Sequence, residues 1–300
     1  MEYQNLELNL LDGMLVDTKP TTFDELIRIS GLSHGTDVWL GNAQSLIEAG
    51  TVTLQDAICC RDDIMIYLIK QGLPPNPSFK IMETVRKGKA LKDPAKWEEY
   101  KALMKEHNVP EWYIKSCEKI KYMFPKAHAA AYVTNAFRIA WFKVHEPLAY
   151  YAAYFSIRAK AFDASCMIFG KEKVKNKMKE IEMKNQKKEA TKAELDMYDD
   201  LEIVLEMYER GFEFLPVDLY ESEATKFKVQ DNKLRPPLNS IPGFGGVAAQ
   251  GIVEARKDGK FMSIDDLKIR AKIGASGADL LKEFGCLEGM SQSNQLSLFG

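Results

Sequence analysis

The pattern of apolar and polar positions predicts a mainly helical chain. Thr22 precedes the apolar run that starts at Phe23, and Glu25 follows three residues after it, which is the signature of a capping box at a helix start. Glycine or proline punctuates most of the segments that follow. We expect a glycine-rich loop over 30–41 and helices over 42–50, 61–70, 78–87, 96–107 and 111–123.

Residues 127–155 form the most apolar part of the chain. Alanines alternate there with Tyr, Phe and Trp, and no charged residue occurs between Lys126 and Arg138. This composition predicts a long buried helix that is broken near Pro147 and followed by a second helix. We expect the aromatic side chains of 137–155 to lie in the core.

In the second half of the chain, first the charge composition and then the spacing of apolar residues changes. Residues 171–192 carry nine lysines and four glutamates, which predicts an exposed helix or the tip of a helical hairpin, followed by an amphipathic helix over 201–210. From about Phe212 the pattern alternates, and two short strands are expected around a turn at Gln230-Asp231-Asn232. A domain boundary is therefore expected within 210–235.

Two glycine-rich turns follow, each at the start of a predicted helix. The first, Ile241–Ala249, reads apolar-Pro-Gly-apolar-Gly and matches a helix-hairpin-helix motif. Its glycines permit a tight turn and bring main-chain N–H groups close to a phosphate. A weaker second unit spans 273–281, after a capped connector at 261–267. Such a pair holds both strands of a duplex across the minor groove, and the alternative is two glycine-closed turns without a ligand. The expected DNA-binding residues are Gly243, Phe244, Gly245, Gly246, Gly274 and Gly277.

The last residues place apolar side chains on a polar tether. Ser291–Asn294 is polar, and Gln295-Leu296-Ser297-Leu298-Phe299 follows it. Apolar anchors on a flexible end typically bind a groove on a partner. The pentapeptide resembles the bacterial sliding-clamp-binding motif, in which Gln295 would orient the peptide, and Leu296, Leu298 and Phe299 would bind the clamp, with Leu298 and Phe299 filling its hydrophobic pocket.

Composition is that of a folded protein of 300 residues with one large domain or two to three smaller ones. Apolar residues make up 46% and charged residues 28%, which excludes global disorder. The net charge of −2 conceals an uneven distribution, since residues 1–60 carry nine acids and two bases, and residues 115–160 carry eight bases and two acids. A basic excess among aromatics is compatible with a phosphate-facing surface or with a solvated helix face.

Five cysteines are an odd number without metal-like spacing, and Cys59 and Cys60 are adjacent. We expect free thiols in a reducing cytoplasm. No apolar run approaches the ~18 residues of a membrane span, and the acidic N-terminus is no secretory signal. The first residues are expected to be the tail of something larger.

A wider resemblance is carried by residues 30–44, 60–65, 79–89, 109–133 and 142–155. They resemble the fingers of the bacterial replicative DNA polymerase III alpha subunit of the PolC type. The tandem hairpins resemble the duplex-binding domain of that family, and QLSLF resembles its clamp motif. The similarity covers nearly the whole chain, more loosely over 165–200. It implies fingers over 1–210, a duplex-binding helix-hairpin-helix domain with a small β-hairpin over 211–290, and a flexible tail over 291–300.

The resemblance also implies a nucleotide pocket. Pro125 ends one helix, and Lys126 and His128 begin the next, where the helix dipole favours anions. By resemblance, this pocket is lined by Arg61, Tyr122, Lys126 and His128, with the loop Ser33-His34-Gly35-Thr36 near the nascent base pair. His128 and Tyr122 have alternative interpretations as core side chains. Arg86, Lys87 and Lys89 could contact phosphates or cap a helix.

Catalysis is expected to lie elsewhere. The family's metal-binding aspartates belong to a palm upstream of the fingers, so we expect neither a catalytic residue nor a metal ligand in this chain, with Mg²⁺ bound by the palm and the dNTP. Asp62-Asp63 is interpreted as a helix start and Asp199-Asp200 as part of a surface segment. The parent would be a DNA polymerase, with this chain inactive by itself. The expected partners are primer-template DNA, dNTP, the beta sliding clamp and other replisome subunits, and no membrane.

Two other classes of protein were weighed. A helix-hairpin-helix DNA glycosylase usually carries a lysine within the hairpin, and Ile241–Ala249 contains none. A non-enzymatic accessory protein that tethers DNA to the clamp stays open as the alternative, because both binding elements are present.

Overall fold

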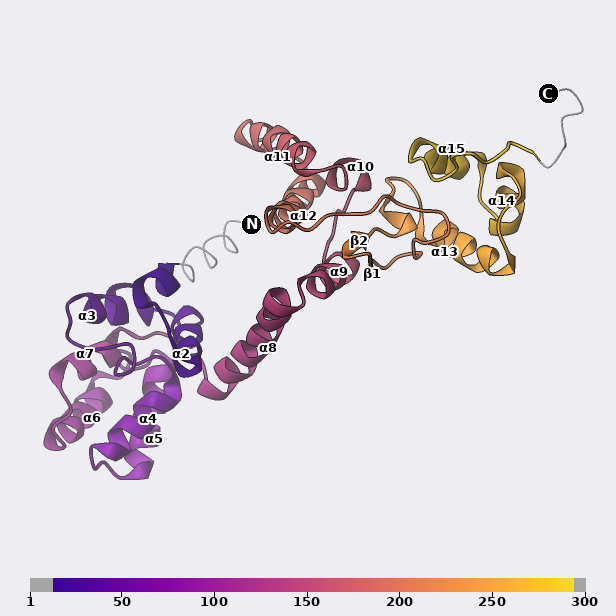
Figure 1. The fold of residues 1–300 in the computed structure, drawn as a ribbon. Coiled ribbons are helices and arrows are strands. Elements are labelled where there is room, and N and C mark those ends of the chain that lie inside the picture. Colours follow the sequence, from indigo (N-terminus) through magenta and orange to yellow (C-terminus); the bar gives the residue numbers. More distant parts are fainter. Residues whose placement is uncertain (1–12, 294–300) are drawn as a thin grey trace, which may run out of the picture. The chain divides into compact units, whose positions relative to one another are not determined.

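The computed structural model describes residues 13–293 (Figure 1), and its contacts divide the chain into two units, Met1–Arg138 and Ile139–Gly300. The division falls within helix α8 (Lys126–His145). The mainly helical fold is confirmed, with one two-stranded sheet among the described residues. No helix in this part of the chain is both long enough and apolar enough to cross a membrane.

The first unit packs short helices around one large apolar core, with a smaller cluster formed by Ile27, Cys60 and Ala129. After a helical segment at 13–18, its elements are α2 (Phe23–Ser33), the kinked turn η1 (Trp39–Ala43), α3 (Gln44–Glu48), α4 (Arg61–Lys70), α5 (Pro75–Arg86), α6 (Pro94–Glu106), α7 (Glu111–Lys119) and the first part of α8. Helices α4 and α5 pack against each other, and fully buried side chains include Ile64, Ile81 and Tyr113.

Several helix boundaries follow the predicted signals and others shift. The capping box at α2 is confirmed, since Thr22 accepts from the Glu25 amide and Glu25 accepts from the Thr22 amide. Helix α2 continues to Ser33, which shortens the expected loop. Helix α5 starts at Pro75 because proline suits the first helical turn. Helix α7 ends at Lys119, since the chain that follows it pairs with Thr36.

A buried polar pair joins η1 to α7. Ser116 donates to Oδ1 of Asn42 over 2.7 Å, and the Asn42 amide donates to the carbonyl oxygens of Asp37 and Ser116. Both side chains are buried, so these bonds satisfy groups that would otherwise be costly in the interior. The pair fixes the backbone just after the loop at 34–38.

The second unit begins after α8 and combines helices with one hairpin. Its elements are α9 (Pro147–Ile157), α10 (Ala164–Met167), α11 (Lys171–Gln186), α12 (Lys192–Glu209), β1 (Lys228–Gln230), β2 (Lys233–Arg235), η2 (Leu238–Ser240), α13 (Gly246–Ala255), η3 (Arg256–Asp258), α14 (Ile264–Ala271) and α15 (Ala275–Glu283). The lysine-rich segment forms α11 and the turn that leads into α12, which lies beside α11 (Figure 1). Helix α12 begins at Lys192, nine residues before the helix expected over 201–210.

The predicted β-hairpin is confirmed. Strands β1 and β2 pair antiparallel with Val229 opposite Leu234, and Asp231 and Asn232 form the turn with φ values of 51° and 55°. Two positive φ values are characteristic of a two-residue turn of this kind. Phe214 and Phe227 pack with Phe155 in one aromatic cluster. The boundary expected at residue 210 therefore falls inside this unit, where both sides of it share a core.

The expectation that the aromatic residues of 137–155 are core is wrong for the first half of that range. Tyr151 and Phe155 of α9 are buried, whereas Phe137, Trp141 and Phe142 of α8 are exposed. Helix α8 carries apolar side chains on all its faces, and a helix neighbour covers only one stripe. The apolar composition alone does not distinguish these two helices.

All five cysteines are free, and four of them are buried. Burial raises the pKa of the Cys60 thiol to about 12 and that of Cys166 to about 11. These thiols are therefore protonated at neutral pH and poorly nucleophilic.

The helix-hairpin-helix region depends on one close helix crossing. Helix α13 packs against α14, and a Cβ atom added at Gly251 would lie 2.4 Å from the carbonyl oxygen of Ala271. That distance is shorter than any real contact, and the partner is main chain that cannot rotate away. Glycine is required here by the approach of the two helices.

We predict that Gly251→Ala destabilises the protein although alanine is the better helix former. The added methyl group forces α13 away from α14 at a cost of about 1–3 kcal/mol. Urea denaturation monitored by circular dichroism measures this change. Gly246→Ala is the matched control, because its added Cβ would meet its nearest atom at 3.6 Å. Equal stability of the two variants would contradict the prediction.

Candidate functional site

A short main-chain pairing brings two distant segments of the first unit together. Thr36 donates to the carbonyl oxygen of Tyr122 over 2.9 Å, and the Lys121 amide donates to the carbonyl oxygen of Thr36 over 3.1 Å. Gly35 lies inside this junction, where a Cβ would meet Val38 Cγ2 at 2.4 Å and the Tyr122 oxygen at 3.1 Å. The loop predicted from Ser33 to Thr36 is thereby held against residues 121–124.

The start of α4 is bonded to the same segment, residues 121–126. The Arg61 amide donates to the carbonyl oxygen of Phe124 over 3.2 Å, and the Lys126 amide donates to Oδ2 of Asp62 over 2.8 Å. Asp62 thus caps the start of α8 from a neighbouring helix. The residues predicted for nucleotide binding lie in three sequence segments, and these main-chain bonds join the three.

An aromatic side chain that the sequence reasoning missed lies at the centre of the site. The Phe124 ring stacks on His34 with ring centroids 5.0 Å apart. It also forms a T-shaped pair with His128, with ring centroids 5.9 Å apart. His34 Nδ1 lies 2.9 Å from the carbonyl oxygen of Ser30 and 3.0 Å from the Ser33 hydroxyl, so the imidazole is held against the end of α2. Only the tertiary pairing identifies Phe124, since its sequence context is that of an ordinary helix end.

Three of the predicted residues have exposed side chains, and two of them, His34 and His128, contact the Phe124 ring. His34, Tyr122 and His128 are exposed, which excludes the core interpretation for Tyr122 and His128. The side chains of Arg61 and Lys126 are each 33% exposed. The Ser33 hydroxyl points back to its own helix and lies 3.1 Å from the carbonyl oxygen of Ser30.

Carboxylates hold the cationic groups in place. Lys126 Nζ lies 3.2 Å from Oδ1 of Asp24, and Arg28 Nε lies 2.9 Å from Oδ2 of the same side chain. The hydrogen bond from Arg28, and to a lesser extent that from Lys126, keeps the pKa of Asp24 below its usual value. The nearest carboxylate oxygen to Arg61 Nε belongs to Asp62, at 3.7 Å, and this buried nitrogen has no hydrogen-bond partner among the described residues.

The basic end of α5 lies beside the segment that links α7 to α8. Met123 donates to the carbonyl oxygen of Arg86, while the Arg86 and Lys87 side chains both pair with Glu83. Hydrogen bonds from Arg86 and then Lys87 lower the pKa of Glu83 to about 2. Lys89 is exposed. The two interpretations of these three basic residues stay open.

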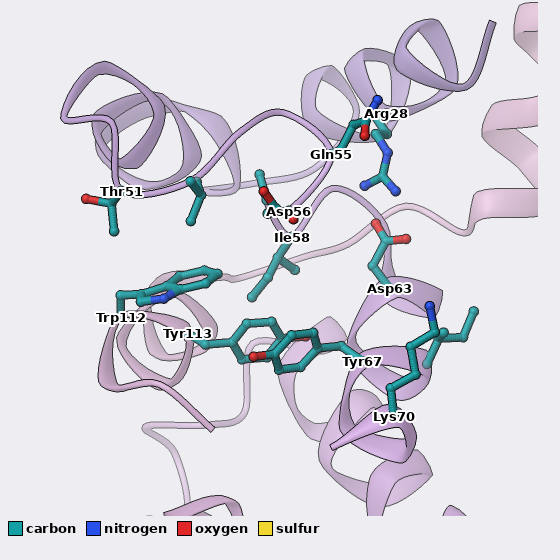
Figure 2. A pocket seen from close by; sticks show the side chains of 13 residues that line it. Arg28, Thr51, Gln55, Asp56, Ile58, Asp63, Tyr67, Lys70, Trp112 and Tyr113 are labelled. Atoms are coloured by element: carbon teal, nitrogen blue, oxygen red, sulfur yellow. The ribbon is translucent and has the colours of Figure 1, made fainter. Parts of the chain in front are cut away.

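A separate pocket of about 400 Å³ opens in the first unit. Figure 2 shows Tyr67 and Tyr113 at its floor, stacked with ring centroids 4.2 Å apart, and Trp112, Arg28 and Asp63 around it. None of the predicted nucleotide residues lines this pocket. Arg28 lines it and also bonds to Asp24, so it links the pocket to the candidate site.

The acidic pairs are engaged in holding the backbone. Asp63 accepts from the Cys59 and Cys60 amides at the start of α4. Asp200 accepts from the amides of Lys160 and Ala161 and is only 2% exposed, so its expected surface position is wrong. The hydrophobic contacts of α12 pull it inward, and burial raises its pKa. Within residues 13–293, no three His, Cys, Asp or Glu side chains are grouped so that they could hold a metal ion.

The second unit presents two helix starts without side-chain caps. Gly245 is the N-cap of α13 and Gly274 is the N-cap of α15, and as glycines they have no side chain to accept hydrogen bonds from the first amides of either helix. Gly245, Gly246 and Gly274 are exposed, so the first amides of both helices are available to an anion. Gly243 takes the positive φ of 78° that its turn requires.

The two turns contact each other through their predicted residues. Phe244 is buried and its ring faces Gly277. A Cβ atom added at Gly277 would lie 3.4 Å from Cε2 of Phe244. Phe244 therefore acts as a core residue, and only its main chain is available to a ligand. In the second turn the positive φ belongs to Lys272, at 55°, and not to a glycine. Lys272 is exposed beside Gly274 and was missed because glycine was taken as the turn signal. The predicted clamp contacts, Gln295, Leu296, Leu298 and Phe299, lie outside the described residues.

Two family models match the chain. Residues 4–108 match the bacterial DNA polymerase III alpha subunit finger domain, and residues 211–296 match the helix-hairpin-helix motif. The segment with Tyr122, Lys126 and His128 lies outside both matches.

Curated relatives match nearly the whole chain. The PolC-type DNA polymerase III of Clostridium perfringens is 54% identical over 287 residues, which are 96% of this chain and 19% of that protein. The PolC-type DNA polymerase III of Bacillus subtilis is 56% identical over 286 residues, 95% of this chain and 19% of that protein. That of Streptococcus suis is 54% identical over 292 residues, 97% of this chain and 20% of that protein. The chain spans about one fifth of the length of these relatives.

Proposed function

Because the chain belongs to the PolC-type DNA polymerase III family and spans about one fifth of such a protein, we propose that it supplies the nucleotide-binding and duplex-binding surfaces of a replicative DNA polymerase. The observation that carries the proposal is the junction around Phe124. Main-chain bonds there join α2, α4 and the start of α8 into one surface that presents Arg61, Lys126 and exposed aromatic rings.

The triphosphate is assigned to the basic side of this surface. Arg61 offers a guanidinium, and Lys126 lies in the first turn of α8, where the helix dipole adds to its positive charge. The buried Arg61 Nε without a hydrogen-bond partner is a donor that an anionic oxygen would satisfy. Tyr122, His34 and His128 provide flat exposed rings for the base and sugar.

Nucleotidyl transfer and its Mg²⁺ are assigned to carboxylates outside this chain. The transfer needs preorganised carboxylates that hold two ions, and Asp62, Asp63 and Asp200 already accept hydrogen bonds from main-chain amides. We therefore propose that the isolated chain is inactive. Incorporation of nucleotides by the purified chain with Mg²⁺ and primer-template would contradict this assignment.

We predict that Arg61→Gln and Lys126→Gln each weaken binding of a deoxynucleoside triphosphate about tenfold, because each removes one charge-assisted hydrogen bond. Saturation-transfer difference NMR on the whole chain measures this weak binding and reports which nucleotide protons lie near the protein. Lys121→Gln is the control, since Lys121 lies in the same segment between α7 and α8, is 73% exposed and pairs with Asp37 instead. Equal loss in all three variants would show that only net charge matters and would reject the site.

The duplex is assigned to the amides at the starts of α13 and α15. Main-chain donors contact phosphates without reading bases, and the exposed Lys272 adds a charge beside the second turn. Contacts of this kind suit an enzyme that moves along any sequence. The mutual packing of the two turns through Phe244 fixes the spacing between them.

We predict that Gly245→Val weakens binding of a primer-template duplex about three- to tenfold, because its side chain covers the amides of α13. Valine fits the backbone there, with φ −72° and ψ 150°, and its Cβ would meet no atom within 4 Å. Fluorescence anisotropy at several salt concentrations measures the affinity. Gln250→Val, at an exposed position of the same helix, is the control. Wild-type affinity of Gly245→Val would remove α13 from the interface.

The C-terminal pentapeptide is assigned to the beta sliding clamp on its sequence alone. We predict that Leu298→Ala combined with Phe299→Ala abolishes capture of the chain by an immobilised bacterial clamp, since a few apolar anchors supply most of the affinity of a peptide. Ser297→Ala, between these residues, is the matched control. Retention of the double variant at the wild-type level would place the clamp contact elsewhere.

A further inference from the structure

Asp24 occupies the point where two cationic side chains of the first unit converge. Its Oδ1 lies 3.2 Å from Lys126 Nζ on α8, and its Oδ2 lies 2.9 Å from Arg28 Nε, one turn along α2. The Asp24 side chain is 52% exposed, so dissolved anions have access to it. Both cations are less exposed than the carboxylate that bridges them.

The two partners hold Asp24 unequally. The bond to Arg28 is the shorter, and it contributes more than Lys126 to lowering the pKa of Asp24. If the ammonium group turned to another anion, Asp24 would still be paired with Arg28 within α2. Exchange of partners at Lys126 therefore leaves no unpaired charge and requires no proton transfer.

Asp62, the other carboxylate of the site, has a different role. Its Oδ2 accepts from the main-chain amide of Lys126, which holds it at the junction between α4 and α8. Displacing Asp62 would break the cap of α8, whereas displacing Asp24 breaks only a side-chain pair. Asp24 is thus the carboxylate that an incoming anion can replace.

We propose that Asp24 is a stand-in for a nucleotide phosphate. It holds the Lys126 ammonium in position while the site is empty, and the triphosphate takes its place on binding. Asp24 therefore competes with the nucleotide and promotes release. This inference rests on the proposed nucleotide site and assigns that site a regulator of affinity.

The test uses the whole chain and inorganic tripolyphosphate as the probe, with binding measured by isothermal titration calorimetry at low ionic strength. We expect Asp24→Asn to bind the probe about two- to fivefold more tightly, the range expected from removing one exposed ion pair. Lys126→Gln weakens binding, and adding Asp24→Asn to Lys126→Gln gives no gain, because the competing pair no longer exists. Asp24→Ser is the second variant, since serine also suits the first turn of a helix.

Asp37→Asn is the matched control. Asp37 pairs with Lys121 over 2.7 Å, so this variant removes the same charge and frees a lysine outside the site. Equal tightening by Asp24→Asn and Asp37→Asn would reduce the effect to net charge and overturn the inference. If Lys126→Gln weakens binding but neither Asp24 variant tightens it, the nucleotide site stands and the stand-in role is wrong. If Lys126→Gln has no effect, or the wild type does not bind the probe, the proposed nucleotide site fails, and the inference fails with it.

Discussion

The pairing of Thr36 with Tyr122 is the constraint on which the candidate nucleotide site depends. Without it, the chain between α7 and α8 would have no fixed position relative to α2, and Phe124 could not stack on His34. The pairing works because Gly35 lets the two backbones approach and because the Asn42–Ser116 bonds hold the segment that follows. The side chains that would meet a ligand are therefore positioned by main-chain geometry, and their own contacts with one another are few. Such a surface is ordered before any ligand arrives, which lowers the entropy lost on binding.

In the second unit, too, packing contacts fix the positions of the groups proposed to bind a ligand. Gly251 allows α13 to approach α14, Phe244 packs over Gly277, and these contacts set the positions of two helix starts. The donors at those starts are main-chain amides, so the chemistry lies in the backbone while the side chains provide the support. The nearly balanced charge of the whole chain is compatible with this arrangement, since amides and helix dipoles attract phosphate without a basic coat.

The sequence predicted those features that local rules determine. The capping box of α2 and the Asp231–Asn232 turn depend on neighbours within a few residues, and both were found. The role of Phe124 and the pairing of Asp24 with Lys126 were not predictable, because each joins residues about 100 positions apart or depends on such a junction. The predictions that Trp141 is buried and that Asp200 lies at the surface were wrong for a related reason. Both properties depend on which neighbouring element covers a helix face. The second turn was predicted wrongly for a third reason: Lys272 adopts the left-handed conformation that local rules assign to glycine.

The uncapped starts of α13 and α15 have a consequence for how this surface tolerates genetic change. Every residue except proline contributes an amide proton, so most point mutations at these helix ends leave the donors intact. A surface of charged side chains loses a contact with each substitution, whereas this one is lost only through proline, through bulk over the amides or through disruption of the turns. The supporting positions, such as Gly243 and Gly251, should therefore be as sensitive to inherited variation as Gly245, which lies next to the amides themselves.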